Sequence, residues 1–330
     1  MHEPRTRITT RITHTVSALL LAWGLAGAQA QPLSAVTTIA MVGDVVANVG
    51  GACVEVTVLM GPGIDPHLFR ASAGDVRTLE NADIIFYNGH DLEGQLGSVL
   101  SRLGERLPTL ALAETIDEAL LLEGEDDFEG QADPHLWMDA SLWANTALPV
   151  AEALSALRPD CAEDMQAAAE AYTEQLLALH AWAQASIASI PEAQRTLVTA
   201  HDAFAYFARA YSIDVASVEG ISTESEASIA DIREATDIVV STGVPAIFIE
   251  TTINPRTIEA VQAAAADRGV EVSIGGELFG DAMGEEGSPE GTYIGMLRSN
   301  VITISRALGG EPADWPEALM DWAAQWDLSN

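Results

Sequence analysis

Apolar and polar positions follow two periodicities along the chain, the alternation typical of strands and the three-to-four-residue spacing typical of helices. In the first half, apolar runs at 36–42, 54–60 and 83–87 predict strands, and the composition of 74–81 favours a helix. Strands that alternate with helices pack as βαβ units, in which neighbouring strands are parallel. The first half is therefore predicted to form a lobe of the βαβ type.

The second half of the chain repeats this alternation. Its predicted strands lie at 195–199, 215–218, 246–249 and 270–274, and its predicted helices lie at 202–211, 229–242, 255–268 and 292–308. A mature chain of about 300 residues is too long for one small core, so two lobes of ordinary domain size are expected. The sequence thus predicts an α/β fold with two βαβ-type lobes and parallel sheets, at 31–158 and 191–330.

The segment 159–190 between the lobes has a composition that favours a helix. Residues 160–189 contain neither glycine nor proline and are rich in alanine, glutamate, glutamine and leucine. A helix of about 30 residues is about 45 Å long, which is enough to span two lobes. Because a flexible Gly/Ser hinge is absent from this segment, one long backbone helix is expected to join the lobes rigidly.

The N-terminus has the three-part layout of a secretory signal peptide, predicted at 1–30. Arginines among the first eleven residues form a basic start, and the apolar stretch 16–26 is too short to span a bilayer. A small-x-small cleavage site ends at Ala30, so cleavage near Ala30 would release the protein into the periplasm. No cysteine lies near this site to carry a lipid, so no membrane anchor is expected. The alternative interpretation is a cytosolic N-terminal helix.

Acidic residues far outnumber basic ones: 49 Asp and Glu against 15 cationic residues, all of them arginine, give a formal net charge of −34. Nucleic acids and anionic membranes repel such a chain, so neither is expected as a partner. A diffuse acidic surface attracts cations in general without forming a metal site. Its simplest interpretation is an adaptation for solubility.

The sequence contains two cysteines, Cys53 and Cys161. An oxidising compartment permits one disulfide between them. Their separation along the chain gives no geometric proof, so the pairing stays open at this point. Two thiols this far apart do not resemble a zinc ribbon or a redox motif.

Three histidines lie at loop positions with unusual surroundings. His67 and His135 each end an Asp-Pro-His phrase, and His201 follows a predicted strand and opens a predicted helix. Proline restricts the residue before it to extended backbone, so each Asp-Pro-His presents its imidazole from a stiff loop. We interpret all three as metal ligands; the alternatives are solvated loop histidines and, for His201, a first helical residue without a metal role. His90 is expected in a surface turn, and His180 on the exposed face of the long helix.

Asp281 is a fourth candidate, because it follows a predicted strand and lies among glycines, although aspartate there is also typical of a turn or a helix N-cap. Three imidazoles and one carboxylate suit Zn²⁺, Mn²⁺ or Fe²⁺ better than Ca²⁺ or Cu⁺. His67, His201 and Asp281 all follow strands, which is where open α/β sheets bind ligands. Because each half supplies two of the four candidates, the metal is expected in the cleft between the lobes.

Longer phrases around these residues resemble one family through the whole mature chain. They are GPGIDPHLFRAS, DIIFYNGHDLEG, DPHLWMD, HDAFAYFARAY, SVEGISTESEAS, IFIETTINPRTI, ELFGDAMGEEG and GTYIGMLRSNV. The chain thus resembles the metal-binding solute-binding proteins of ABC importers, the TroA/ZnuA/PsaA-type family. The resemblance implies that the protein captures a divalent zinc or manganese ion and delivers it to a membrane permease driven by an ATPase. It implies the ligands His67, His135, His201 and Asp281, and for Asp281 it is the main support. The protein is expected to be a monomer.

The ion itself stays open between zinc and manganese, with iron as a further candidate. In the family, manganese-preferring members tend to carry Glu at the third ligand position, where this chain has His201, and an added imidazole favours zinc. Zinc members often have a His-rich loop before the second ligand, whereas the stretch 123–131 is short, acidic and free of histidine. They also commonly lack the final Asp ligand, which is present here as Asp281. Zinc therefore leads manganese only slightly.

Three rival functions remain beside metal import. A zinc-dependent hydrolase could use the same His/Asp cluster, but four protein ligands fill the coordination shell, and the sequence has no HExxH motif to supply a base. A binding protein for an organic solute needs a cleft lined with aromatic and hydrogen-bonding groups. A surface adhesin is disfavoured because the lipid-anchor cysteine is missing. The sequence favours a transport protein and not an enzyme.

Overall fold

Parallel strands form the first sheet of the protein, whose computed structural model describes residues 2, 31–124, 128 and 130–328. The sheet has the order β2-β1-β3-β4, and each neighbouring pair is parallel. Its strands are β1 (Leu33–Ile39), β2 (Val54–Met60), β3 (Ile84–Tyr87) and β4 (Thr109–Ala111). Residues 35–39 of β1 are buried, as expected for a central strand that is covered on both faces.

The described second half contains two parallel strand pairs, β5 with β6 and β7 with β8. These strands are β5 (Thr196–Thr199), β6 (Asp214–Ser217), β7 (Ala246–Glu250) and β8 (Ser273–Leu278). Strand β5 contacts β7, so the two pairs lie next to each other. The predicted α/β fold with parallel sheets is confirmed.

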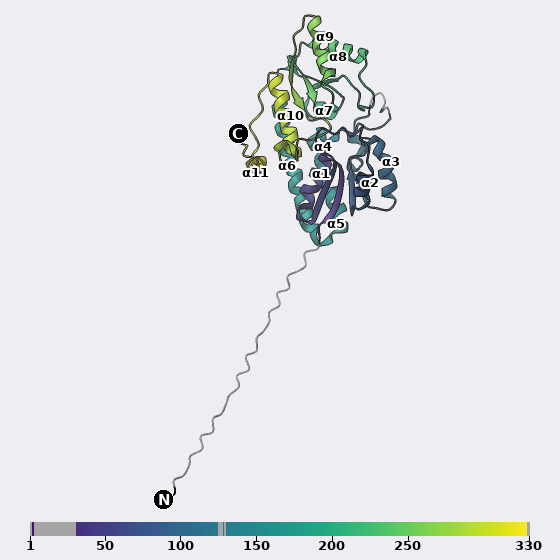
Figure 1. Cartoon of the computed structure of the whole chain (residues 1–330). Helices are drawn as coiled ribbons and strands as arrows, with labels where there is room; N and C mark the ends of the chain where they lie inside the picture. The colour runs from purple at the N-terminus through teal and green to yellow at the C-terminus, as the bar shows by residue number, and fades with distance from the viewer. Residues whose placement is uncertain (1, 3–30, 125–127, 129, 329–330) are drawn as a thin grey trace. The chain divides into compact units, whose positions relative to one another are not determined.

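Helices alternate with these strands (Figure 1). In chain order they are α1 (Ala40–Gly50), α2 (Ala73–Glu80), α3 (Gly97–Gly104), α4 (Ala140–Trp143), α5 (Ala147–Leu157), α6 (Ala162–Ala188), α7 (Ala205–Tyr211), α8 (Ile229–Thr242), α9 (Arg256–Asp267), α10 (Tyr293–Ala307) and α11 (Met320–Gln325). Helix α6 has 27 residues and a length of about 40 Å. It contacts α1 and α5 from the first half and α7 and α10 from the second. The predicted long backbone helix is therefore confirmed.

The sequence pattern misses helix α1. The strand predicted at 36–42 is wrong in its last three residues, because α1 begins at Ala40. Four valines of α1 recur at helical spacing and are buried to 99% or more, although valine runs are also typical of strands. The four are Val42, Val45, Val46 and Val49.

The strand predicted at 270–274 lies closer to the C-terminus in the structure, where β8 covers Ser273–Leu278. Two adjacent glycines disfavour a strand prediction here. Gly275 is required by close packing, since a Cβ atom on it would lie 2.7 Å from Phe248 and 2.8 Å from Ala307. This close approach holds β8 against α10.

Cys53 and Cys161 form a disulfide, which answers the question that the sequence left open. The bond joins the residue before β2 to the residue before α6, across a sequence separation of 108. It therefore ties the first sheet to the long helix.

Removing this disulfide is expected to destabilise the protein. A crosslink that closes a long loop restricts the unfolded chain and typically contributes about 3 kcal/mol. The double variant Cys53→Ser/Cys161→Ser should lose about that much of its free energy of unfolding, measured by urea denaturation of metal-free protein. Wild type treated with a reductant should behave like the variant. Equal stability of the variant and the oxidised wild type would contradict this prediction.

Within the described residues, no helix is both long enough and apolar enough to cross a membrane. The signal peptide predicted at 1–30 and its cleavage site near Ala30 lie, apart from His2, outside the residues that the structure describes.

Candidate metal centre

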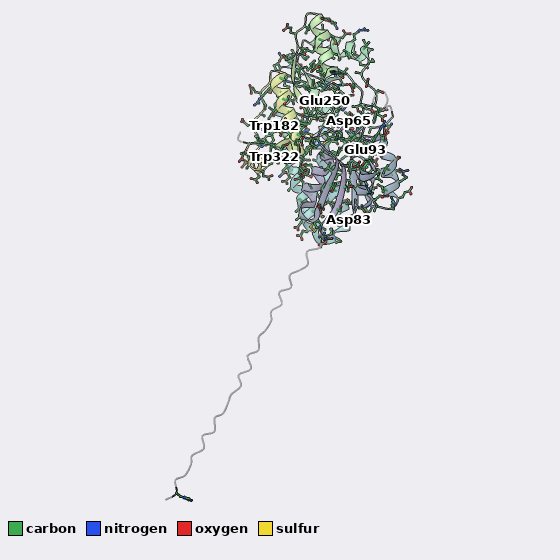
Figure 2. All side chains as sticks on the ribbon, viewed as in Figure 1. Asp65, Asp83, Glu93, Trp182, Glu250 and Trp322 are labelled. Atoms are coloured by element: carbon green, nitrogen blue, oxygen red, sulfur yellow. A yellow bond between two sulfur atoms is a disulfide. The ribbon has the colours of Figure 1, made fainter. Side chains whose placement is uncertain are left out.

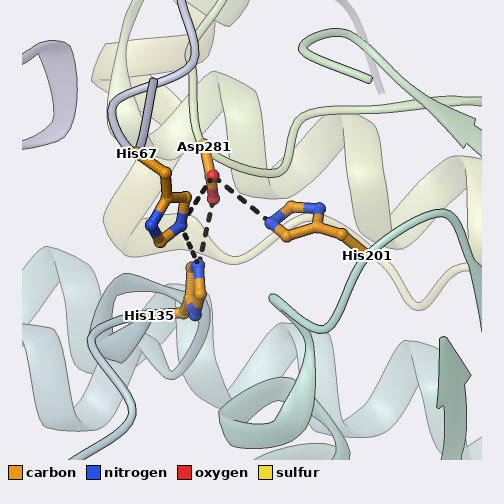
Figure 3. A group of neighbouring side chains, drawn as sticks. All are labelled: His67, His135, His201 and Asp281. Carbon is orange, nitrogen blue, oxygen red and sulfur yellow. Dashed lines mark hydrogen bonds and ion pairs between the residues drawn. The ribbon is translucent and has the colours of Figure 1, made fainter. Parts of the chain in front are cut away.

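Four buried side chains converge on one point (Figure 3). His67, His135, His201 and Asp281 each offer a ligand atom, and these atoms all lie within 4.8 Å of one another. Each of the four residues is at most 2% exposed. The structure thus brings together all four residues that the sequence suggests as metal ligands.

The ends of parallel strands supply three of these side chains. His67 lies in the loop after β2, His201 follows β5 by two residues, and Asp281 follows β8 by three. His135 comes from the loop before α4, in the second Asp-Pro-His phrase. Side chains at the carboxyl ends of parallel strands commonly form ligand sites in α/β folds.

The spacing of the four groups matches that expected around a metal ion. Bonds of about 2.0–2.1 Å in a tetrahedral zinc site put neighbouring ligand atoms about 3.4 Å apart. Asp281 Oδ2 lies 3.4 Å from His67 Nε2 and 3.3 Å from His201 Nε2, and its Oδ1 lies 3.3 Å from His135 Nε2. The Nε2 atoms of His67 and His135 are 3.4 Å apart.

Several of these atoms also lack an aligned hydrogen-bond partner. Both carboxylate oxygens of Asp281 and Nε2 of His201 are buried without one. Buried polar atoms in native proteins almost always have a partner, so an unsatisfied group of this kind requires an explanation. A cation bound among the four residues would provide it.

Two further carboxylates orient the imidazoles. Asp133 Oδ1 lies 2.8 Å from Nδ1 of His135, and Glu250 Oε2 lies 2.7 Å from Nδ1 of His201. Glu250 is labelled in Figure 2. Its other oxygen, Oε1, accepts the backbone N–H groups of Ala200 and His201 at 2.8 and 2.9 Å. Carboxylates on Nδ1 fix the ring and direct Nε2 toward a metal. The sequence interpretation missed Glu250, whose one local signal is an acidic residue that ends an apolar strand.

The first Asp-Pro-His phrase has a different pattern of contacts. Asp65 Oδ1 accepts the backbone N–H of His67 at 2.9 Å, and its Oδ2 accepts the hydroxyl of Thr223 at 2.6 Å. Asp133 instead accepts both the backbone N–H, at 2.9 Å, and the ring of its own histidine. In both phrases the aspartate therefore accepts the backbone N–H of the histidine two residues later. The second contact differs: Asp65 accepts the hydroxyl of Thr223, and Asp133 contacts the ring of His135.

Two hydrogen bonds hold the ligand loops to their surroundings. The indole N–H of Trp137 donates to the backbone oxygen of Gly280 at 3.0 Å, which links the His135 loop to the Asp281 loop. Asn88 donates from its side-chain amide to the backbone oxygen of Pro134, also at 3.0 Å. These bonds are buried, so the ligands are held in place before any ion arrives.

Opposite charges set the protonation of the metal-free cluster. Burial lowers the pKa of His135, but Asp281 and Asp133 outweigh it and raise that pKa to about 9. Burial also lowers the pKa of His201, and Glu250 and Asp281 together raise it well above its ordinary value. Burial raises the pKa of Asp281, yet His201 and His135 hold it well below its ordinary value. The cluster thus combines an ionised carboxylate with protonated imidazoles.

The remaining histidines considered from sequence lie outside this cluster. His90 lies in a turn, as predicted, with a positive φ of 48°, but it is half-buried and not fully at the surface. His180 was expected on the exposed face of the long helix, and this is wrong: its side chain is 17% exposed, and its Nδ1 lies 3.3 Å from Asp139 Oδ1. Helix α6 packs against α4, so the side that carries His180 is largely covered.

An α/β fold with parallel sheets, a long central helix and a buried His₃Asp cluster defines a metal-binding solute-binding protein. The model of the ZnuA family, zinc-uptake complex component A periplasmic, matches residues 35–307, and the chain belongs to this family.

Similar proteins include the zinc-binding protein TroA of Treponema pallidum (strain Nichols), 46% identical over 284 residues that cover 86% of this chain and 91% of TroA. The manganese-binding lipoprotein MntA of Bacillus subtilis (strain 168) is 41% identical over 279 residues, or 84% of this chain and 90% of MntA. The solved structure of periplasmic zinc binding protein TroA from Treponema pallidum has a TM-score of 0.81 at 44% identity, covering 84% of this chain and 99% of that one. Fe(III)-bound YtgA from Chlamydia trachomatis has a TM-score of 0.76 at 28% identity, covering 86% and 100%.

Proposed function

We propose that this protein captures a divalent transition-metal ion, zinc or manganese, and delivers it to the permease and ATPase of an ABC importer. The observation that carries the proposal is the convergence of four buried ligand atoms at spacings of 3.3 to 3.4 Å around Asp281. The ligands in this proposal are His67, His135, His201 and Asp281. Membership of the zinc-uptake family supports the transport role.

A binding role without catalysis fits the site better than a zinc hydrolase does. A catalytic zinc needs an open coordination position and a nearby general base. Here all four ligands are at most 2% exposed, and the neighbouring carboxylates Asp133 and Glu250 already contact imidazoles. The zinc-loaded protein is expected to show no turnover in a screen of ester, peptide and phosphate substrates, and turnover would favour the hydrolase.

The donor set favours zinc slightly over manganese. Three imidazoles bind zinc more strongly than manganese, while the carboxylate suits both ions. The names of the relatives point both ways, because TroA is called zinc-binding and MntA manganese-binding. The Fe(III)-bound state of YtgA supports iron as a further candidate.

Replacement of His201 tests the role of the third imidazole. Metal-stripped wild type is expected to bind both Zn²⁺ and Mn²⁺ in competition calorimetry, and to lose both ions to EDTA. In His201→Glu the preference for zinc over manganese should fall by about tenfold, which corresponds to the loss of one favourable contact of about 1.4 kcal/mol. Glu250 lies 2.7 Å from this imidazole, so a glutamate at position 201 would face a second carboxylate. The same measurement should therefore be made on the double variant His201→Glu/Glu250→Gln and on the single variant Glu250→Gln.

If metal-stripped wild type binds neither ion, the proposed function fails. An unchanged ratio of the two affinities in His201→Glu would contradict the part assigned to this imidazole.

The cellular setting extends the same proposal. We propose that a signal peptide at 1–30 is cleaved near Ala30 and that the mature protein is a periplasmic monomer. Its lobes would be 31–158 and 191–330, joined by 159–190. The family description as periplasmic supports this location. MntA is named a lipoprotein, whereas both cysteines of this sequence are joined in the Cys53–Cys161 disulfide, which supports a protein without a lipid anchor.

A further inference from the structure

The hydrogen bond between Asp65 and Thr223 spans the two halves of the chain beside the metal centre. The two residues are 158 positions apart, and the hydroxyl of Thr223 donates to Asp65 Oδ2 at 2.6 Å. The other oxygen of Asp65 holds the backbone N–H of His67. One carboxylate therefore connects the loop that carries a metal ligand to the segment 221–227 of the other half.

Thr223 is buried although its neighbours are not. It is 7% exposed, whereas Ser222 and Glu224 on either side line a cavity. The buried hydroxyl of Thr223 has Asp65 as its partner. A hydrogen bond to a charged acceptor is among the stronger ones in proteins. Thr223 thus holds the segment 221–227 against Asp65, while the adjacent polar side chains face the cavity.

This cavity lies against His67, one of the four proposed ligands. It has a volume of about 380 Å³, and its lining is mostly polar: beside His67 it consists of Asp91, Gly94, Phe128, Gln131, Ser222, Glu224 and Ser225. Hydroxyls and carboxylates of this kind solvate a divalent cation, so the cavity offers a polar path between solvent and the ligand His67. Thr223 lies between the lining residues Ser222 and Glu224, and Asp65 holds the backbone of the lining residue His67, so their hydrogen bond lies beside this cavity.

We propose that Thr223 is a positioning residue for metal exchange. Its hydroxyl holds Asp65, and with it the loop of His67, in the arrangement that keeps the ion enclosed. When this hydrogen bond breaks, the loop separates from the segment 221–227, His67 moves toward the cavity, and the ion leaves by that path. The inference rests on the proposed function, since it concerns release of the same ion.

Thr223→Val tests the proposal, because it keeps the shape of the side chain and removes the hydroxyl. Zinc-loaded protein is mixed with excess chromophoric chelator in a stopped-flow instrument, and the rate of zinc dissociation is recorded. We expect dissociation to be about tenfold faster in Thr223→Val, the factor that corresponds to one net hydrogen bond to a charged group. Thr223→Ser restores the hydroxyl and should dissociate within about twofold of wild type.

Thr257 provides a matched control. Its hydroxyl donates to Glu219 Oε1 at 3.2 Å, a threonine–carboxylate bond that stays within one half of the chain. Thr257→Val should lower the thermal stability of metal-free protein about as much as Thr223→Val does, yet leave zinc dissociation within about twofold of wild type. This comparison separates control of exchange from a general loss of stability. Thr223→Ala removes the same hydroxyl and takes the place of Thr223→Val if the valine variant does not fold.

Two results would overturn the inference. Equal dissociation rates in Thr223→Val and Thr257→Val would show that the bond between the halves does not control release. A Thr223→Ser protein as fast as Thr223→Val would show that the hydroxyl is not the active feature. If wild type takes up no zinc, the proposed function itself fails. This outcome differs from the two results above, in which wild type still binds zinc.

Discussion

Zinc affinity is expected to fall about thousandfold in Asp281→Asn, a loss of about 4 kcal/mol of binding free energy. Asp281 is the only ligand of the proposed four with a negative charge, and its oxygens lie 3.3 to 3.4 Å from all three imidazoles. The amide keeps the size of the side chain but removes the charge that attracts the cation. Because the site is fully buried, solvent cannot replace that charge. Competition with a chelator of known affinity measures the loss.

A second buried aspartate provides the control for this variant. Asp139 is 6% exposed and caps α4, where its Oδ1 accepts the backbone N–H of Ser141 at 2.9 Å. Asp139→Asn removes a charge of the same kind outside the cluster, so its zinc affinity should stay within about threefold of wild type. A decrease smaller than about tenfold in Asp281→Asn would show that Asp281 is not a ligand.

The sequence predicts elements well where one local pattern has one structural meaning. The helix predicted at 229–242 agrees with α8, and the strand predicted at 54–60 agrees with β2. Helix α8 has an N-terminal capping box built on Ser228, a strong local signal. Helix α1 escapes prediction because its buried valines satisfy the strand pattern as well as the helical one. Only packing against β2 and α6 decides between them.

The same limit applies to the metal centre. The three histidine ligands are visible in sequence because each belongs to a loop phrase with its own character, whereas Asp281 depends mainly on the resemblance to the family. Glu250 is not visible in sequence, because its contact with His201 depends on β7 lying beside β5, which no local pattern encodes. Asp65 and Asp133 show this most clearly, since the same phrase Asp-Pro-His gives one aspartate an imidazole and the other a threonine from the opposite half. The second contact of each aspartate therefore depends on the tertiary structure and not on the local sequence.

Zinc affinity should also rise with pH, by at least about tenfold per pH unit between about pH 6 and 8. In the metal-free protein the pKa of His135 is raised to about 9, so its ring carries a proton through this range, and the pKa of His201 is raised in the same direction. A metal-bound imidazole carries no proton on the ligating nitrogen. Binding therefore displaces at least about one proton, and each displaced proton makes the affinity about tenfold higher per pH unit. Above the pKa of His135 the dependence should become shallower.

Calorimetry in two buffers of different ionisation enthalpy counts these protons directly. Wild type should release at least about one proton per zinc ion at pH 7. Asp281→Asn should release fewer, because Asp281 is one of the groups that raise the pKa values of His135 and His201. The number of protons and the loss of affinity in Asp281→Asn thus test the same carboxylate independently. Release of fewer than about half a proton by wild type would mean that the imidazole of His135 is already neutral, and that Asp281 and Asp133 do not hold it protonated.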